Sequence, residues 1–183
     1  MENFSNNFLI AMPHLSDSIF GKSLIYLCDH NEYGSMGVII NKLIPSKNIE
    51  NILIQTGLEQ LKPDIEIYFG GPVKLETGMI LHDTKYKTKG TINVSRNISL
   101  SSNLNIINDI INGIGPNKFK FTLGYAGWDK GQLEKEIENG DWLLIPSNYD
   151  IIFNTPYNKI WEKLCSEIDI DVDLFSGGLS GIS

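Results

Sequence analysis

The amino-acid sequence predicts an α+β fold built around a mixed sheet, and three observations lead to this class. Segments rich in strand-forming residues occur before, between and after the segments with helical spacing, so the regular alternation of a parallel α/β protein is missing. Turn-forming residues join several neighbouring strand segments directly, which is typical of hairpins. The glycine-rich turns G-x-G-x-x-G and G-x-x-x-x-G-K-[ST] do not occur, so we expect no nucleotide bound through them.

Length and composition predict one domain over residues 1–183. The 183 residues, 42% of them hydrophobic, suffice for one well-filled core, and neither a linker nor an internal repeat divides them. We find no N-terminal signal sequence and no apolar run of the roughly 18 residues that a membrane span needs. We therefore expect a cytoplasmic protein without membrane contact, in which both cysteines are reduced thiols.

The first half of the chain contains five predicted strands and two helical segments. Residues 47–58 carry apolar side chains at helical spacing, and Gly57 supplies a left-handed stop. Residues 15–21 have serine and aspartate cap signals that suit a single helical turn. Residues 70–77 are rich in turn formers and separate two strands. The predicted strands cover residues 8–12, 22–28, 36–41, 65–69 and 78–82.

The second half contains four further strands and three helices. Asp129 and Gln132 have the spacing of a capping box. Thr155 is the predicted cap of the last helix, and Pro156 is predicted at its first helical position. Cys165 falls in the apolar stripe of the last helix, which indicates core packing. The predicted strands cover residues 91–94, 118–125, 142–146 and 150–153, and the helices cover residues 102–111 (with Ser102 as cap), 129–140 and 155–168.

The charge distribution disfavours direct DNA binding. The net charge is −7, and only one of the 15 basic residues is an arginine, the side chain best suited to guanine edges and phosphates. Ten carboxylates and three lysines lie between Glu134 and Asp173. Two small lysine clusters, at residues 85–89 and 118–120, alternate with aromatic residues, which favours solvated strand faces over a nucleic-acid surface.

A thiol and an imidazole, Cys28 and His30, lie two residues apart in the stretch YLCDHNEYGSMGVIIN, residues 26–41. Alternation along the strand places Cys28 with Tyr26 on the more polar face. A nucleophilic cysteine needs a thiolate, whereas an ordinary thiol has a pKa of about 8.5. His30, or His82 if the sheet brings it alongside, could lower that pKa. Two hypotheses stay open: a thiol-dependent enzyme, or a Cys28 packed at a strand end with His30 capping a loop.

The same residues, together with Asp83, could be drawn as a metal site. Structural zinc sites usually show paired ligands such as C-x-x-C or H-x-x-x-H, and this sequence has neither. We therefore expect no metal, and no motif predicts a cofactor.

Two glycine-containing motifs, FGGP (69–72) and GYAGW (124–128), begin at the ends of predicted strands. The first could present backbone amides to an anion or simply permit a tight turn. The second precedes a helix whose N-terminus could hold an anion, although Asp129 is placed to satisfy those amides itself. Trp128 either seals the edge of the sheet or stacks on a ligand.

The segments FLIAMPHLSDSIFGKSLIYLCDHNEYGSMGVIIN, FGGPV, GMILH, LGYAGWDKGQLEKEI and DWLLIP occur in this order along the chain. With them the sequence resembles the bacterial YqgE/AlgH family over nearly its whole length. The resemblance implies a single α+β domain with a mixed sheet bent into a pseudo-barrel and flanked by helices. It implies no established activity or cofactor, and one branch of the family carries the name of a transcriptional regulator. The final GGLSGIS departs from the glycine, histidine and alanine with which relatives usually finish.

The polar motif residues at strand ends, without a recognisable catalytic set, predict a non-enzymatic regulatory domain that binds a small ligand or a protein partner. A thiol-dependent enzyme using Cys28 with His30 or His82 is the alternative, and a transcriptional regulator that contacts DNA directly is a second one. The ligand-binding candidates are Asn41, Gly70, Gly71, Tyr125 and Trp128.

Overall fold

The structure, a computed structural model, describes residues 3–16, 18–57 and 65–168. The strands are β1 (Asn7–Ala11), β2 (Leu24–Asn31), β3 (Gly34–Ile39), β4 (Ile67–Phe69), β5 (Val73–Asp83), β6 (Ile92–Asn93), β7 (Ile98–Ser101), β8 (Phe119–Asp129) and β9 (Trp142–Pro146). The helices are a 3-10 turn (Pro13–Leu15), α1 (Ser46–Thr56), α2 (Leu104–Ile111), α3 (Gln132–Glu138), α4 (Tyr149–Phe153) and α5 (Tyr157–Glu167).

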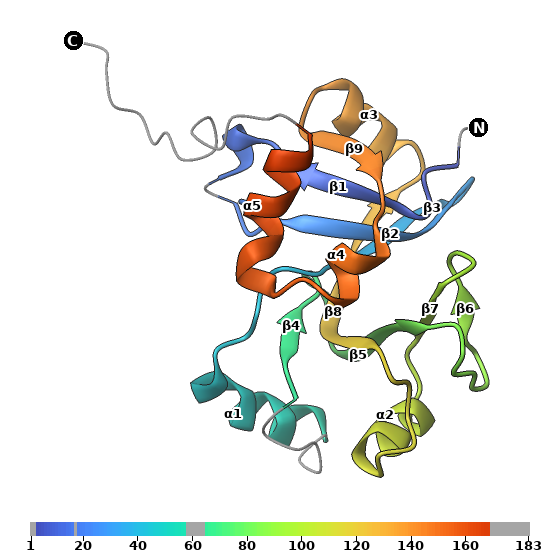
Figure 1. Ribbon diagram of the computed structural model, residues 1–183. Coiled ribbons are helices and arrows are strands. Elements are labelled where there is room, and N and C mark those ends of the chain that lie inside the picture. The colour runs from blue at the N-terminus through green and yellow to red at the C-terminus, as the bar shows by residue number, and fades with distance from the viewer. Residues whose placement is uncertain (1–2, 17, 58–64, 169–183) are drawn as a thin grey trace.

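The strands of the described residues form one sheet in the order β6-β7-β5-β8-β3-β2-β1-β9, with β4 added beside β8. The β4–β8 pair is parallel and the other pairs are antiparallel, so the sheet is mixed. The sheet curls into a half-barrel with helices around it (Figure 1), which confirms the predicted fold class. Strand β8 joins the two halves, because its first part pairs with β4 and β5 and its last part pairs with β3.

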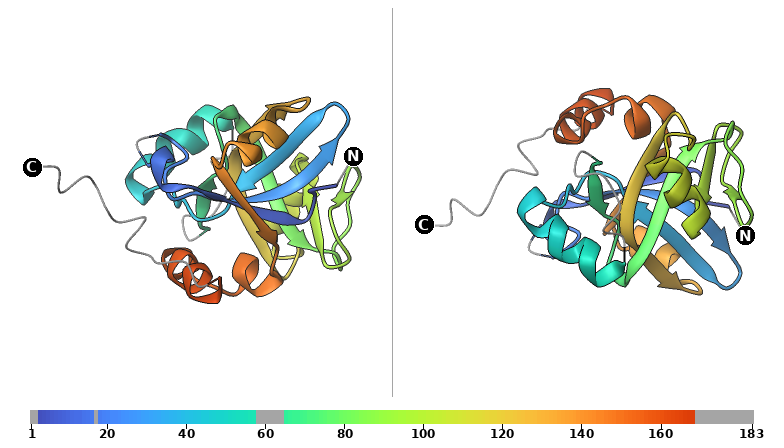
Figure 2. Two further views of the ribbon diagram at one scale, coloured as in Figure 1. Left: turned by 90° about the horizontal axis from the view of Figure 1, so that it is seen from above. Right: turned by 90° about the horizontal axis from the view of Figure 1, so that it is seen from below.

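Three apolar clusters hold the helices against the sheet. Helices α1 and α2 pack on β4, β5 and β8 through Leu53 and Ile106, whereas α4 and α5 pack on the largest cluster through Ile152 and Leu164. Helix α3 packs through Leu133 on the third cluster, which also includes both buried tryptophans. The views from above and below (Figure 2) place α1 and α5 on opposite sides of the molecule. Both faces of the sheet are therefore covered.

The structure corrects four element predictions. Residues 150–153 form helix α4 and not a strand, because the Asn148 side chain accepts from the Asp150 amide and starts a helical turn. Strand β7 is an additional strand, and its serines can be buried because they find polar partners inside the protein. Strand β8 continues through the whole GYAGW motif to Asp129, beyond its predicted end at residue 125. Strand β5 likewise begins at Val73, inside the predicted turn.

Two predicted helix caps are also corrected. Asn103 and not Ser102 caps α2, since its side chain accepts from the Ile106 amide at 3.1 Å. The Thr155 hydroxyl donates to a backbone oxygen and Pro156 takes the cap position of α5. The left-handed stop at Gly57 is confirmed, with φ at 70°.

Lys120 is buried, which contradicts its predicted place on a solvated strand face. Only 6% of the residue is exposed. Its Nζ donates to Ile40 O at 2.9 Å and lies 4.2 Å from the centre of the Tyr68 ring. The alternation along β8 was identified correctly, but the segment around α4 and α5 covers the face that carries Lys120. Residues 85–89 lie in a loop after β5 and not in a strand.

Some predictions fall outside the described residues. They concern Asp17, the carboxylates after residue 168 and the C-terminal GGLSGIS. Extension of one domain over residues 1–183 stays a prediction. Among the described helices, none is both long and apolar enough to cross a membrane.

Candidate functional site

Cys28 lies in the interior and not at an open strand end. The register between β2 and β3 shifts between Leu27 and Asp29, so Cys28 is the extra residue of a β-bulge. It packs in the same cluster as Tyr26, and 3% of it is exposed, so the prediction of a more polar face is wrong. The thiol donates to Tyr26 O at 3.5 Å. Burial, together with the nearby Asp29 charge, raises the pKa of Cys28 well above its ordinary value, so it stays a protonated thiol.

His30 faces the other side of the sheet from Cys28. Residues two apart share a face in a regular strand, but the bulge breaks this alternation. The His30 ring stacks on Phe4 at 4.6 Å, and Phe4 packs on the cluster below α3 and not on the cluster that holds the thiol. Its Nδ1 lies 2.8 Å from Ser35 Oγ, and its Nε2 lies 3.9 Å from Glu134 Oε1. Cys28 and His30 therefore do not form a nucleophile–base pair.

His82 is not brought alongside Cys28 either. Strands β8 and β3 separate its strand, β5, from β2 in the sheet. Its ring is fully buried, with Nδ1 at 2.8 Å from Asp83 O and Nε2 at 3.0 Å from Ser101 Oγ. Burial lowers the pKa of His82, which favours the neutral ring. In the described part of the chain, no three His, Cys, Asp or Glu side chains are grouped as metal ligands would be.

Asn41 serves the framework of the sheet. Its Oδ1 accepts from the Leu24 amide at 2.9 Å, and its Nδ2 donates to Lys22 O at 2.8 Å. Both ends of the side-chain amide are thus used to join the end of β3 to the start of β2. This candidate has a structural role in the geometry shown.

Gly70 and Gly71 also serve the framework, at the point where β3, β4 and β8 meet. The Gly70 amide donates to Leu123 O and its oxygen accepts from the Ile39 amide, both at 2.8 Å. A Cβ at Gly71, where φ is 149°, would lie 2.2 Å from the backbone carbon of Tyr125. The glycine pair therefore permits close contact between chain segments, and the Gly70 amide is not free for a ligand.

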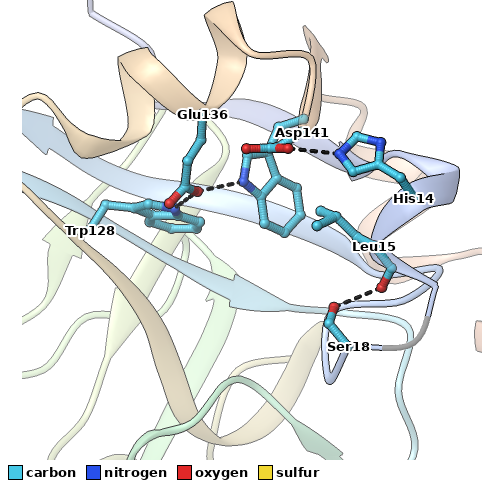
Figure 3. A network of polar contacts seen from close by, with 7 residues as sticks. His14, Leu15, Ser18, Trp128, Glu136 and Asp141 are labelled. Atoms are coloured by element: carbon cyan, nitrogen blue, oxygen red, sulfur yellow. Dashed lines mark hydrogen bonds and ion pairs between the residues drawn. The ribbon is translucent and has the colours of Figure 1, made fainter.

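Trp128 belongs to a saturated polar cluster under α3 (Figure 3). Its indole Nε1 donates to Glu136 Oε2 at 2.8 Å, and the indole of Trp142 donates to the same oxygen at 2.8 Å. Gln132 donates to the other oxygen of this carboxylate at 2.8 Å. The two indole rings meet edge to face, with centroids 5.9 Å apart. Trp128 thus uses its donor for the framework and seals this part of the sheet.

A second polar contact ties the chain down beside this cluster. His14 Nε2 lies 2.7 Å from Asp141 Oδ1, and the Ser18 hydroxyl donates to Leu15 O at 2.7 Å (Figure 3). The His14 contact holds the segment after β1 against the turn before β9, and the Ser18 contact closes a turn within that segment. His14 is more than half exposed, so it adds a surface contact to the cluster.

An open groove lies between the β2–β3 hairpin, the last part of β8 and the start of β5. Its volume is about 660 Å³. Tyr125 and Trp128 contribute to its lining, whereas the other three ligand-binding candidates do not. One wall exists because β5 leaves its partner between Val73 and Gly78, which pair with Tyr125 and Leu123 of β8. The residues between them bulge away from this partner, and Lys74 and Thr77 among them line the groove.

The groove combines adaptable apolar side chains with exposed carboxylates. Met36, Met79 and Tyr125 contribute to its lining and also pack on or in the largest core cluster. Asp29 and Asp129 are exposed and lie in its lining, together with one exposed ammonium, that of Lys74. The groove therefore has an apolar floor and a net negative edge.

The sequence model of the family described as DUF179, AlgH-like, matches residues 8–173. The chain belongs to this AlgH-like family. Among curated relatives, a UPF0301 protein of Marinomonas sp. is 41% identical over 96% of this chain and 94% of its own length. A UPF0301 protein of Pseudoalteromonas translucida is 36% identical over 96% of this chain and 97% of its own length. The family predicted from the sequence motifs is thereby confirmed.

Two solved structures are similar in fold. The solution structure of the AlgH protein of Pseudomonas aeruginosa has a TM-score of 0.75 and 31% identity, covering 98% of this chain and 96% of its own. A crystal structure of a Corynebacterium diphtheriae protein has a TM-score of 0.71 at 22% identity, covering 95% of this chain and 92% of its own. The half-barrel is thus shared by AlgH and by this more distant chain.

The sequence did not show that five residues lie around one groove. These residues are Asp29, Met36, Lys74, Met79 and Asp129. The bulge of β5 brings Lys74 opposite the hairpin, and the sequence shows no pattern for this beyond the GGPVKLET turn signal. Glu136 was also missed, although its position four residues after Gln132 on a helix already predicts that the two side chains meet.

Proposed function

We propose that this chain is a cytoplasmic regulatory domain that binds a segment of a protein partner in the groove between the β2–β3 hairpin and the start of β5. One observation carries the proposal: Tyr125 and Trp128 of the family motif line an open groove, whereas Cys28, His30 and His82 are buried away from it. A cytoplasmic location is supported by two cysteines that are buried and unpaired.

The shape and lining of the groove favour a polypeptide over a small molecule. Small-molecule sites are mostly enclosed and apolar, whereas this groove is open and mixes polar and apolar side chains. Methionine side chains such as Met36 and Met79 adapt to the shape of a partner, and tyrosines are enriched in protein interfaces. A partner segment can therefore place an apolar residue on the methionines and keep polar atoms at the rim.

The charges at the groove favour a partner segment with lysine or arginine. Two exposed carboxylates, Asp29 and Asp129, face one exposed lysine there, and the whole chain carries a net charge of −7. Complementary charge speeds encounter and suppresses wrong partners. The same charges repel the phosphates of DNA, so a regulatory effect through a protein is favoured over direct DNA contact.

The thiol-dependent alternative lacks support in the geometry. A catalytic cysteine requires a thiolate next to a base, whereas Cys28 is buried with a raised pKa and His30 lies on the opposite face of the sheet. A binding domain without such a set acts by holding its partner in place or away from others, which is a regulatory role.

Site-specific photo-crosslinking tests the groove directly. Tyr33 lies at its edge with 82% exposure, so a photoreactive phenylalanine at this position faces any bound partner. In native cells we expect one discrete crosslinked adduct, and mass spectrometry should find a lysine- or arginine-containing peptide in it. The same residue at Ile114, 69% exposed in the loop after α2, is the matched control and should give no such adduct.

Charge reversal separates a specific partner from nonspecific contact. Asp29→Lys combined with Asp129→Lys should reduce the Tyr33 adduct by about ten-fold or more, because the basic segment loses its attraction. A control with Glu50→Lys and Glu162→Lys makes the same charge change on exposed helix positions away from the groove and should leave the adduct intact. An adduct that survives the groove reversal, or no adduct at all, contradicts the proposal.

A further inference from the structure

A second cavity, separate from the groove, lies between strands β4 and β8 and the segment that joins α4 to α5. Its volume is about 350 Å³, within the range of about 300–1,000 Å³ in which small-molecule sites fall. Phe119, Ile152 and Phe153 contribute apolar walls, and Lys120 of β8 also contributes to the lining. None of the residues lining this cavity lines the groove.

Lys120 is a buried cation with spare hydrogen-bonding capacity. An ammonium has three N–H donors, and the structure uses one of them, in the 2.9 Å bond to Ile40 O. The Tyr68 ring, 4.2 Å away, offers its π face. Among the described residues, no carboxylate forms an ion pair with Lys120. A buried charge without a counter-ion is costly, and a bound anion would offset that cost.

The nearest acid does not neutralise the lysine. Glu66 is exposed at the cavity and accepts the hydroxyl of Tyr68 at 2.5 Å. It attracts the ammonium from a distance, while burial, the larger effect, lowers the pKa of Lys120 to about 8. Lys120 therefore remains mostly protonated near neutral pH and keeps its charge inside the cavity.

The start of helix α5 adds a second favourable element for an anion. Its cap residue Pro156 and its first residue Tyr157 line the cavity, and no side chain caps this end of the helix. Thr155, the residue expected to cap it, donates its hydroxyl to Asp150 O instead. The Lys159 amide donates to Pro156 O, which leaves the Tyr157 and Asn158 amides and the helix dipole to favour negative charge at this position.

We propose that this cavity binds a small organic carboxylate, whose anionic group pairs with Lys120 Nζ and whose apolar body packs against Phe119, Ile152 and Phe153. The lysine and the uncapped start of α5 recognise the charge, while the apolar walls select against simple inorganic anions. The site does not depend on the groove, so either can fail without the other. A role of this site as a sensor for an acidic metabolite rests on the regulatory function proposed above, whereas the binding itself does not.

Thermal unfolding with matched probes tests the site. Benzoate and hexanoate carry the required charge and an apolar body, benzamide has the body of benzoate without its charge, and inorganic phosphate has charge without a body. At about ten times the dissociation constant, a carboxylate should stabilise the protein by about 1.4 kcal/mol and raise Tm by about 3–6 °C, and Tm should keep rising with the logarithm of carboxylate concentration above that point. Benzamide and phosphate should give no comparable rise. Equal shifts with benzamide or phosphate, or none with either carboxylate, overturn the proposal.

Variants on β8 and next to it locate the effect. Lys120→Met keeps the aliphatic stem and removes the ammonium, so the carboxylate shift should be lost. Lys118→Met removes an exposed lysine two residues earlier and should keep the full shift. A shift that persists in Lys120→Met overturns the assignment.

A measurement on the unmodified protein covers the case in which Lys120→Met does not fold. The ¹⁵Nζ resonance of Lys120 should move saturably with benzoate and stay in place with benzamide. Because a bound anion stabilises the ammonium, the titration midpoint of this resonance should also rise above about 8. A resonance that benzoate does not move overturns the proposal.

Discussion

A charged side chain lies near each end of strand β8, and the two differ in how many hydrogen bonds they make. At the C-terminal end, the Glu136 carboxylate receives three side-chain donors at 2.8 Å, from Trp128, Trp142 and Gln132. Near the N-terminal end, the Lys120 ammonium makes one hydrogen bond and opens into a cavity. The first arrangement stabilises the fold, whereas the second leaves hydrogen-bonding capacity for a ligand.

The largest effect on stability is expected at the C-terminal end of β8, where Glu136 accepts three side-chain hydrogen bonds. Glu136→Leu leaves two largely buried indole N–H groups without their acceptor, so the free energy of unfolding should fall by about 2–3 kcal/mol. Glu136→Gln keeps one acceptor oxygen and should cost less than about half of that. Urea denaturation at constant m-value measures both. Glu138→Gln, an exposed position on the same helix, is the control and should stay within about 0.5 kcal/mol of wild type.

If Glu136→Leu unfolds at the same urea concentration as wild type, the comparison between the two ends fails. The carboxylate would then be one of many surface acceptors that water replaces, and the indoles would not depend on it.

A smaller effect of opposite sign is expected at Lys120. In the absence of ligand, Lys120→Met removes a buried charge that has no counter-ion and should raise the free energy of unfolding at pH 7 by about 1–2 kcal/mol. Lys118→Met, the exposed control, should change it by less than about 0.5 kcal/mol. A loss of about 2 kcal/mol in Lys120→Met would instead make the lysine part of the framework.

The pH dependence sharpens this prediction. The folded pKa of Lys120, about 8, lies below the unfolded value, so this side chain binds more protons in the unfolded chain between about pH 8 and 10.5, and its contribution to wild-type stability should rise with pH there. The advantage of Lys120→Met should therefore shrink between pH 7 and 9.5. Burial raises the pKa of Cys28, Tyr26 and Tyr68, which opposes this trend above about pH 8.5 for the thiol and above about pH 10 for the tyrosines. These groups are present in both proteins, so the measured quantity is the difference in stability between Lys120→Met and wild type.

Much of the fold was predictable because local patterns and tertiary packing agree. The strands that became β1, β2, β3 and β9 are runs of β-branched and aliphatic residues, and α1 combines helical spacing with the Gly57 stop. Prediction failed where tertiary partners decided. Strand β7 reads as a serine-rich loop until Asn93 and His82 are placed beside its serines. Two adjacent isoleucines made α4 look like a strand, although the Asn148 cap decides otherwise.

The candidate site was predictable to a lesser degree for a related reason. Tyr125 and Trp128 do line the groove, but a one-residue bulge at Cys28 moved His30 to the opposite face, and a bulge has no clear sequence signal here. Lys120 alternates with aromatic residues as an exposed strand lysine does. Its burial follows from α4 and α5, which pack there only in the folded chain.

The smallest effect is expected from His30 on the reactivity of Cys28. In a Cys165→Ala background, Cys28 should react with iodoacetamide at least about 10³-fold more slowly in the native state than in urea, because alkylation requires opening of the core. The raised pKa of Cys28 leaves little thiolate even at pH 8. The pH midpoint of the alkylation rate should be the same in His30→Gln as without this substitution, since the two side chains lie on opposite faces of the sheet. A fast native reaction with a midpoint below about 8.5 that His30→Gln abolishes would place an activated thiolate at this bulge.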